Sequence, residues 1–435
     1  MKRTLAYLIV LFALVLAACQ PATPTAAPAT QPPAATKAPT QAPTNTPAPT
    51  TPPEKVVTIG FTASLTGKLN VESTRQNNGL KLWMDQVNAA GGIKLADGTI
   101  VKFQAKFYDD ESNADRVQEL YTKLVTEDKA DFLISPYSSG LADAAAVIAQ
   151  QYEKIMITTG AAAEGTYKKG YTLVYQTYTP AGHYLTGAID LLASLDPNVK
   201  KIAIVHENDK FSTAVSDAVK AYAEGKGYEV VLYEGYDSGT TDFAPIVTKI
   251  ESARPEVVIG GGHFADGQQF AKAIYEKNLP VKMIALLVAP PEAKFAEIGD
   301  AALGVIGPSQ WEPLAAFKPD YGPTGEEFVK AYKEAFGEEP SYHAAGGYAA
   351  GLILQKAIET AGSLDTQAIK QALDNMDMTI FFGHIKFDTS AEQHGLQIGH
   401  EMVYIQWQKD ASGNLVKQVI WPEAAATAKP LYPIR

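Results

Sequence analysis

The sequence is poor in the residues that carry covalent or metal chemistry. Cys19 is the only cysteine among 435 residues, so no disulfide can form within the chain and the fold depends on its core. The seven histidines are scattered without metal-ligand spacing, and the segment 400–404 lacks the second histidine of a zinc protease helix. No Gly-rich loop ends in Gly-Lys-Ser or Gly-Lys-Thr, and no Gly-x-Ser-x-Gly turn marks a nucleophile. We therefore expect no catalytic residue, no metal and no cofactor.

Positive charge is also scarce. The chain has 37 Lys and Arg against 48 Asp and Glu, a formal net charge of −11. An acidic surface of this kind argues against nucleic acid and against electrostatic binding to anionic lipid. After Leu16 no apolar run approaches membrane-spanning length. The chain from Glu54 to Arg435 is long enough for two lobes with cores of their own.

The first residues have the composition of an export signal. Met1-Lys2-Arg3 is basic, Leu5 to Leu16 is apolar but too short to span a bilayer, and small residues follow. We expect residues 1–18 to be a signal peptide. Leu16-Ala17-Ala18-Cys19 resembles the bacterial lipoprotein cleavage box, which makes Cys19 the lipid attachment site. The alternative is an ordinary signal peptide with a chance cysteine.

Residues 19–54 form a candidate linker of Pro, Thr and Ala. Eleven of the 27 prolines lie between Gln20 and Pro53, with almost no charge. Such a segment cannot bury a core, and it forms a semi-rigid spacer of at most about 100 Å. We expect the protein to lie at the extracytoplasmic face of the cell membrane (periplasm or cell surface), attached through the lipid alone.

The most informative stretch runs from Phe132 to Glu164. Its pattern predicts one βαβ unit. The unit consists, in order, of the apolar run 132–134, a turn with Ser138 and Ser139, a helical pattern over 141–152, a buried strand over 155–158 and a small-residue turn over 160–163. Ligands bind outside the carboxyl ends of parallel strands, and a helix N-terminus favours an anion there. We expect this unit to bind the anionic end of a small ligand. Alternatively, the serines only cap the helix and the small residues only pack.

Strands and helices alternate along the rest of the chain, which predicts an α/β fold with two doubly wound, Rossmann-like lobes joined by a three-strand hinge. We expect helices over 75–90 and 180–195 among others, and strands over 382–388, 402–408 and 415–421 in the second lobe. The predicted lobes comprise 55–177 with 312–378, and 180–310 with 380–425. The chain then crosses between them near 177–180, 309–313 and 377–381.

Several motifs, taken in order, resemble one family. Ile59-Gly60-Phe61, Leu65-Thr66-Gly67 and the run 87–93 are followed by Ser138-Ser139-Gly140, by 202–206 and by Pro340-Ser341-Tyr342. Together, over about 55–425, they resemble type I periplasmic binding proteins, most closely the branched-chain amino acid (Leu/Ile/Val-type) substrate-binding proteins of ABC importers. The resemblance implies two lobes that close over a small ligand, and a permease as partner. We expect a monomer.

The resemblance also implies site residues. The carboxylate-binding serine falls on Ser139, next to Ser138, and backbone groups that bind the ligand fall on Gly160 and Ala162, with Ala161 between them. The remaining candidates are aromatic or hinge residues. Phe211, and Tyr342 with His343, have core packing as the alternative, and Trp311 has hinge packing. One of His263 and Phe264, beside Gly262, is the last candidate.

One departure concerns the acidic residue that pairs with a ligand ammonium in this family. The expected loop reads Leu287-Val288-Ala289-Pro290-Pro291 and has no acid before Glu292. A buried ammonium without a counter-charge is costly. Either Glu292, Glu72 or Asp209 substitutes, or the ligand has no ammonium. For Glu72, the alternative is a solvated loop charge.

These observations predict a substrate-binding lipoprotein of an ABC importer rather than an enzyme. A branched-chain or other aliphatic amino acid is the leading ligand, with aromatic acids and short amides as alternatives. Two other classes stay open at this point: a ligand sensor that feeds a signalling partner, and an enzyme acting on a small amide.

Overall fold

The computed structural model describes residues 52–315 and 317–434, which belong to one compact unit. The signal peptide, Cys19 and most of the predicted linker lie outside the described residues. Among the helices of the described ranges, none combines the length and the apolar character needed to cross a membrane.

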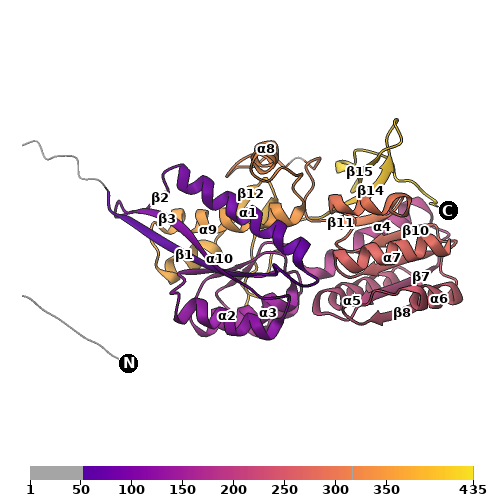
Figure 1. The fold of residues 1–435 in the computed structure, drawn as a ribbon, viewed down its shortest axis with the longest axis horizontal. Helices are drawn as coiled ribbons and strands as arrows, with labels where there is room; N and C mark the ends of the chain where they lie inside the picture. The colour runs from indigo at the N-terminus through magenta and orange to yellow at the C-terminus, as the bar shows by residue number, and fades with distance from the viewer. Residues whose placement is uncertain (1–51, 316, 435) are drawn as a thin grey trace, which may run out of the picture. The chain divides into compact units, whose positions relative to one another are not determined.

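The first lobe is built on a six-stranded sheet with the order β2-β3-β1-β4-β5-β6. Its strands pair in parallel except for β2, which is antiparallel to β3. Helices α1 and α9 lie on one side of this sheet, and α2 and α3 lie on the other (Figure 1). The strands are β1 (Glu54–Ala63), β2 (Ile93–Lys94), β3 (Ile100–Asp109), β4 (Phe132–Ile134), β5 (Met156–Thr158) and β6 (Val174–Gln176), and the helices are α1 (Asn70–Ala89), α2 (Ala114–Thr126), α3 (Ser139–Gln151), the 3₁₀ helix η1 (Glu164–Lys169), α8 (Gly325–Phe336), α9 (Tyr342–Ala361) and α10 (Thr366–Asp374).

The second lobe is built on a seven-stranded sheet with the order β15-β14-β11-β10-β9-β7-β8. Helices α4 and α5 contribute to the core on one face, and α6 and α7 to the core on the other. Its elements are η2 (Ala181–His183), α4 (Thr186–Leu195), β7 (Lys201–Glu207), α5 (Lys210–Gly225), β8 (Glu229–Tyr236), α6 (Ala244–Ala253), β9 (Val257–Gly261), α7 (Phe264–Lys277), β10 (Met283–Leu286), η3 (Ala293–Ala302), β11 (Ile306–Ser309), β14 (Val403–Lys409), β15 (Leu415–Trp421) and η4 (Glu423–Ala425).

The predicted two-lobed α/β class is confirmed, with local differences. The expected helix over 180–195 is divided into η2 and α4, and α1 begins at Asn70, one turn earlier than predicted. Strand β11 and the 3₁₀ helix η3 were not predicted. The early start of α1 matters because it places Glu72 in the first turn of a helix instead of in a loop.

The predicted third crossing is wrong. Strands β12 (Asp377–Ile380) and β13 (Gly383–Lys386) form a two-stranded hairpin whose apolar residues, with Phe387, belong to the core of the first lobe. The chain therefore enters the second lobe after Phe387 and before Val403, not near 377–381. The apolar residues of 380–387 pack against first-lobe helices, a tertiary contact that strand periodicity does not reveal.

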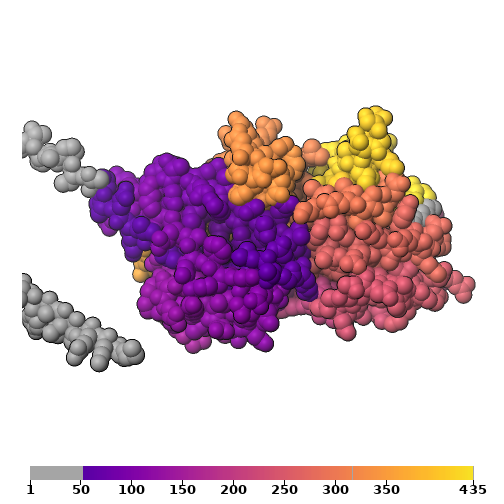
Figure 2. Space-filling model, viewed as in Figure 1, coloured from indigo at the N-terminus to yellow at the C-terminus, as the bar shows by residue number. Residues whose placement is uncertain are grey.

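The three connecting segments are hydrogen-bonded to one another. The N–H of Thr179 donates to Gln310 Oε1 at 2.9 Å, and the Thr179 hydroxyl donates to the carbonyl of His400 at 3.2 Å. Burial lowers the pKa of His400 to about 4, so its neutral ring donates from Nε2 to the Gln310 carbonyl at 2.8 Å. These contacts join the hinge segments into one unit. In the space-filling view, the indigo surface of the first lobe directly borders the second lobe (Figure 2).

Candidate ligand-binding cleft

The candidate site is the buried interface between the two lobes, where strands of both lobes end; we call this interface the cleft, because a ligand would enter it when the lobes separate. From the first lobe come the turns after β4 (135–139) and β5 (159–163), together with the start of α1. From the second lobe come the loops after β7 (208–209) and β9 (262–263). Carboxyl ends of parallel strands leave backbone groups uncovered, which is why ligands bind there in open α/β sheets.

Ser139 connects the two turns of the first lobe. Its hydroxyl accepts hydrogen bonds from the N–H groups of Ala162 at 3.0 Å and Ala163 at 3.1 Å. Ser138 occupies the N-cap of α3 but makes no side-chain capping bond. The predicted proximity of the serines to the small-residue turn is therefore present, whereas the alternative role as side-chain caps is not.

The turn after β5 requires glycine at its first position. Gly160 has φ +68°, and a Cβ built there would lie 2.4 Å from Gln76 Oε1 and 2.5 Å from Tyr137 Cδ2. Only glycine accepts this conformation and this crowding without strain. Tyr137, which the sequence analysis did not single out, thus covers the backbone on which we expected the ligand carboxylate.

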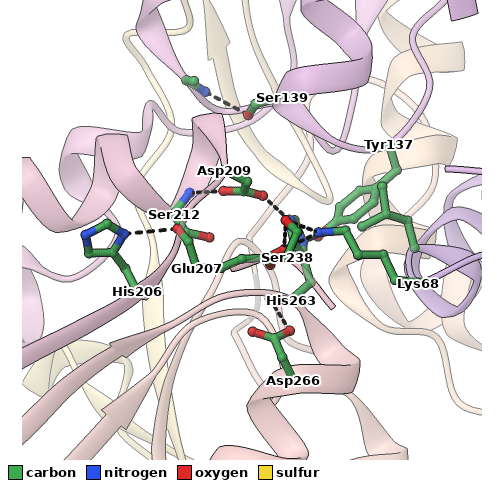
Figure 3. Close-up of polar contacts among 12 residues, drawn as sticks. Lys68, Tyr137, Ser139, His206, Glu207, Asp209, Ser212, Ser238, His263 and Asp266 are labelled. Atoms are coloured by element: carbon green, nitrogen blue, oxygen red, sulfur yellow. Dashed lines mark hydrogen bonds and ion pairs between the residues drawn. The ribbon is translucent and has the colours of Figure 1, made fainter. Parts of the chain in front are cut away.

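A chain of three polar side chains crosses the cleft (Figure 3). Tyr137 of the first lobe lies 2.9 Å from His263 Nδ1, and His263 Nε2 lies 2.6 Å from Asp209 Oδ2 in the second lobe. Burial alone would lower the pKa of His263, but the charge of Asp209 and the hydrogen bond to it raise the pKa to about 9. The protonated ring therefore donates to Asp209 from Nε2 and to the Tyr137 hydroxyl oxygen from Nδ1.

Asp209 is correspondingly held as a carboxylate. Burial would raise its pKa, but the positive charge of His263, the hydrogen bond from that ring and the N–H of Ser212 lower the pKa of Asp209 to about 2. Ser212 N–H donates at 2.6 Å, so Asp209 also caps helix α5. Asp209 is thus already paired.

Glu72 lies at the centre of the interface and is completely buried. The alternative of a solvated loop charge is therefore wrong. One carboxylate oxygen accepts the N–H of Phe264 from the second lobe at 2.9 Å and lies 3.9 Å from Nδ1 of the protonated His263 ring. The other oxygen is buried without a hydrogen-bond partner among the described residues. The N-terminus of α1 stabilises negative charge at this position.

Close packing of two helices positions Glu72. A Cβ at Gly79 of α1 would lie 1.9 Å from the carbonyl oxygen of Ala344 in α9, and a Cβ at Gly347 would lie 1.9 Å from the carbonyl oxygen of Gln76. The two glycines let the helix backbones touch. This contact fixes the direction in which the first turn of α1 points.

Glu292 has partners of its own. It is buried and accepts a hydrogen bond from His343 Nδ1 at 2.7 Å, and Arg75 lies 3.9 Å away. Burial opposes ionisation, but the contacts with His343 and Ser341 and the charge of Arg75 leave the pKa of Glu292 below its usual value. Of the three acids considered as ammonium partners, Glu72 is therefore the one with a buried carboxylate oxygen that has no hydrogen-bond partner among the described residues.

The predicted aromatic residues divide into two groups. Phe211 packs against His263 (ring centroids 5.9 Å apart), and Phe264 donates its N–H to Glu72, so both lie at the cleft. Trp311 is 1% exposed and packs edge-on against Phe328 and Phe381 in the first-lobe core. Tyr342 and His343 are also buried; the His343 ring lies 5.1 Å from the Tyr137 ring. Trp311 thus takes its alternative role as a packing residue.

Three charged residues of the cleft had no signal in the sequence. Lys68 of the first lobe forms an ion pair with Glu207 of the second, and Asp266 lies in the first turn of α7 (Figure 3). Glu207, Asp209 and His263 each place one ligand atom within 4.8 Å of the others, a spacing compatible with a metal ion. In this arrangement Lys68 and the protonated His263 provide the positive charge.

Fold and cleft together define a two-lobed solute-binding protein. A family model described as "Periplasmic binding protein" matches residues 56–413. The chain therefore belongs to the periplasmic binding protein family. As the motifs predicted, the proteins to which it is similar include Leu/Ile/Val-binding proteins and a branched-chain amino acid transporter substrate-binding protein. Its relatives are extracytoplasmic solute-binding proteins, not enzymes.

Two curated relatives illustrate the similarity. The "Leu/Ile/Val-binding protein homolog 7" of Brucella melitensis is 24% identical over 392 residues, which cover 87% of this chain and 94% of the relative. The leucine-, isoleucine-, valine-, threonine- and alanine-binding protein of Pseudomonas aeruginosa is 23% identical, covering 83% and 92%.

Solved structures show the same fold with two kinds of ligand. The Streptococcus pneumoniae protein LivJ in complex with isoleucine has a TM-score of 0.68 at 21% identity, covering 85% of this chain and 100% of that one. A Rhodopseudomonas palustris solute-binding protein in complex with benzoate has a TM-score of 0.70 at 20% identity, covering 86% and 100%.

Proposed function

We propose that this protein is the lipid-anchored receptor of an ABC importer and that it binds a small amino acid, with branched-chain or other aliphatic side chains as the leading class. The carboxylate of the ligand binds the backbone of the turn 160–162, next to Ser139. Its ammonium binds Glu72. The side chain lies against Phe211 and Phe264.

The observation that supports this proposal is the buried carboxylate oxygen of Glu72 that has no hydrogen-bond partner among the described residues. A buried carboxylate oxygen without a partner costs free energy, and a ligand ammonium would recover it through a charge-assisted hydrogen bond. Glu72 already contacts the second lobe through Phe264. An ammonium on Glu72 would therefore strengthen the closed arrangement, which is how a ligand shifts a two-state equilibrium.

Ligand entry requires the lobes to separate. Tyr137 covers Gly160 and contacts His263, so a carboxylate reaches the turn only after Tyr137 has moved. The hinge segments allow such motion with few dihedral changes. The lobes would then close over the ligand, and the permease would recognise the closed form.

An aromatic carboxylic acid is the second candidate, favoured by the buried rings of Phe211, Tyr184 and Tyr137 around the cleft. It would leave the second carboxylate oxygen of Glu72 without a hydrogen-bond partner, because a benzoate has no ammonium. A short amide would also leave it without a cation. A sensor role for the same cleft would differ only in the partner.

A thermal-shift screen of the mature domain tests the ligand. We expect stabilisation by L-leucine, L-isoleucine, L-valine or L-alanine, about 2.7 kcal/mol at a hundred times Kd, and none by benzoate or 4-hydroxybenzoate. Stabilisation by the benzoates alone would contradict the amino-acid proposal. Replacement of Cys19 by Ala in the full chain tests the anchor: the variant should leave the membrane fraction. Pull-down from membranes with the mature domain as bait separates importer from sensor: recovery of an ABC permease would support the importer, and recovery of a signalling protein would support the sensor.

A further inference from the structure

The loop between β1 and α1 sends one lysine across the cleft. The ammonium of Lys68 donates hydrogen bonds to Glu207 Oε1 and, at 2.9 Å, to the hydroxyl of Ser238, both in the second lobe. The Lys68 side chain is about one-third exposed (34%), whereas Glu207 is almost fully buried (2%). A primary ammonium thus reaches a buried carboxylate of the second lobe from the opposite lobe (Figure 3).

The surroundings of this ammonium are acidic. A Cβ built on Gly262 would lie 2.6 Å from Glu207 Oε2 and 2.3 Å from Asp266 Oδ2, so the two carboxylates lie side by side. Burial and the charge of Glu207 raise the pKa of Asp266 to about 6. Glu207 Oε2 is buried without a hydrogen-bond partner among the described residues. We call Glu207, Ser238 and Asp266 the amine pocket.

The amine pocket adjoins the proposed ligand site. A carboxylate oxygen of Glu207, a carboxylate oxygen of Asp209 and a ring nitrogen of His263 lie within 4.8 Å of one another. His263 in turn contacts Tyr137 across the cleft. Four carboxylates face this region (Glu72, Glu207, Asp209 and Asp266), against two cations, Lys68 and the His263 ring. Asp209 is paired with His263, so Glu207 depends on Lys68 for its counter-charge.

We propose that Lys68 is a specificity-determining residue: its ammonium fills the amine pocket and so excludes ligands with a cationic side chain. A buried carboxylate needs a cation, and Lys68 supplies it from within the chain. A ligand with a neutral side chain leaves this pair intact. A ligand with a second ammonium would have to displace Lys68 or bring two positive charges together. The inference about selectivity rests on the proposed amino-acid site, but the existence of the amine pocket does not.

Chemical rescue tests the pocket without any knowledge of the ligand. Lys68→Ala removes the ammonium and opens its space, and we expect a lower Tm that millimolar n-butylammonium chloride restores, relative to sodium chloride at equal ionic strength. No such rescue is expected in the wild type or in Lys68→Met, because a long side chain fills their pocket. None is expected in the double variant Lys68→Ala/Glu207→Gln either, because its pocket lacks the Glu207 carboxylate. Lys81→Ala, which removes an exposed lysine of α1, is the matched control. Absence of rescue in a folded Lys68→Ala protein, or equal rescue in the double variant, would overturn the pocket.

Selectivity is then measured by calorimetry with L-leucine, L-lysine and L-ornithine. We expect Lys68→Ala to gain L-lysine or L-ornithine binding by roughly tenfold or more over wild type, and Lys68→Ala/Glu207→Gln to lose that gain. If wild type binds L-leucine and Lys68→Ala gains no basic ligand, the selectivity inference fails while the proposed function stands. If no protein binds an amino acid but butylammonium rescues Lys68→Ala, the proposed function fails, and with it the selectivity claim, while the pocket stands.

Discussion

Replacement of Glu72 by Gln separates ligand binding from folding. The amide keeps the volume of the carboxylate, and its oxygen can still accept the N–H of Phe264, which Glu72 binds at 2.9 Å. The variant loses the negative charge and the oxygen that has no partner among the described residues. We therefore expect the ligand-free protein to fold with a Tm within roughly 2 °C of wild type, since the desolvation cost of the buried carboxylate disappears together with its attraction to the His263 ring 3.9 Å away.

The effect on affinity should be much larger. A hydrogen bond to a charged group contributes about 1.5–3 kcal/mol, so Kd for an amino acid should rise roughly 10- to 150-fold. At a ligand concentration of a hundred times the wild-type Kd, stabilisation should fall from about 2.7 to between roughly 0.3 and 1.4 kcal/mol. Calorimetric titration gives the same quantity directly as the change in Kd.

Asp85→Asn is the matched control. It removes an exposed carboxylate from the same helix, paired only with Lys81, and should leave Kd unchanged. Wild-type amino-acid affinity in Glu72→Gln would show that the ammonium binds elsewhere, and tighter benzoate binding in this variant would favour an aromatic acid as ligand. A large loss of Tm without ligand would mean that Glu72 acts mainly as a structural residue.

Three further predictions follow from the cleft. Ser139→Ala leaves the N–H groups of Ala162 and Ala163 without their acceptor, so the free energy of unfolding in urea should fall by about 1–3 kcal/mol. Ser194→Ala on the exterior of α4 is the control, and an unchanged midpoint in Ser139→Ala would contradict the role of the hydroxyl. Gly160→Ala should cost more than about 1 kcal/mol and weaken ligand binding, because the positive φ and the contact with Tyr137 exclude a methyl group; normal stability would show that the turn adapts. The pKa of His263 is raised from 6.5 to about 9. This shift adds on the order of 3 kcal/mol of stability, which is complete below pH 6.5 and is lost as the pH rises through 9. His263→Gln should remove this dependence of the unfolding free energy on pH, and an unchanged dependence would assign it to other groups.

Much of the fold followed from local sequence. The spacing of apolar residues predicted a helix over 75–90, whose end agrees with that of α1 to within one residue, and the alternation of strands and helices predicted two mostly parallel sheets. Such features depend on neighbours within a few residues, through helical periodicity, glycine after a helix and β-branched runs. The proximity of Ser139 to the small-residue turn was also predictable, because the carboxyl ends of neighbouring parallel strands meet at one edge of a sheet; ligand binding at this turn stays a prediction.

The charged part of the cleft was not predictable in the same way. Lys68 and Glu207 are 139 residues apart, and Glu72 and Phe264 are 192 residues apart. Nothing near Glu207 in the sequence indicates that it is buried, and nothing near Glu72 distinguishes an exposed charge from an interior one. The hairpin β12–β13 was likewise assigned to the wrong lobe, because its partners are helices far away in sequence.

The sequence by itself determined the alternating architecture, the family and the backbone turn at Gly160, since each depends on short-range periodicity, ordered motifs or the absence of a side chain. Only the tertiary structure decided that Glu72 has a carboxylate oxygen without a hydrogen-bond partner among the described residues, that Tyr137 covers the turn and that Lys68 pairs with Glu207. The free energy of a charge is set by its desolvation and by the charges around it, and for Glu72, Glu207 and Glu292 the partners come from the opposite lobe.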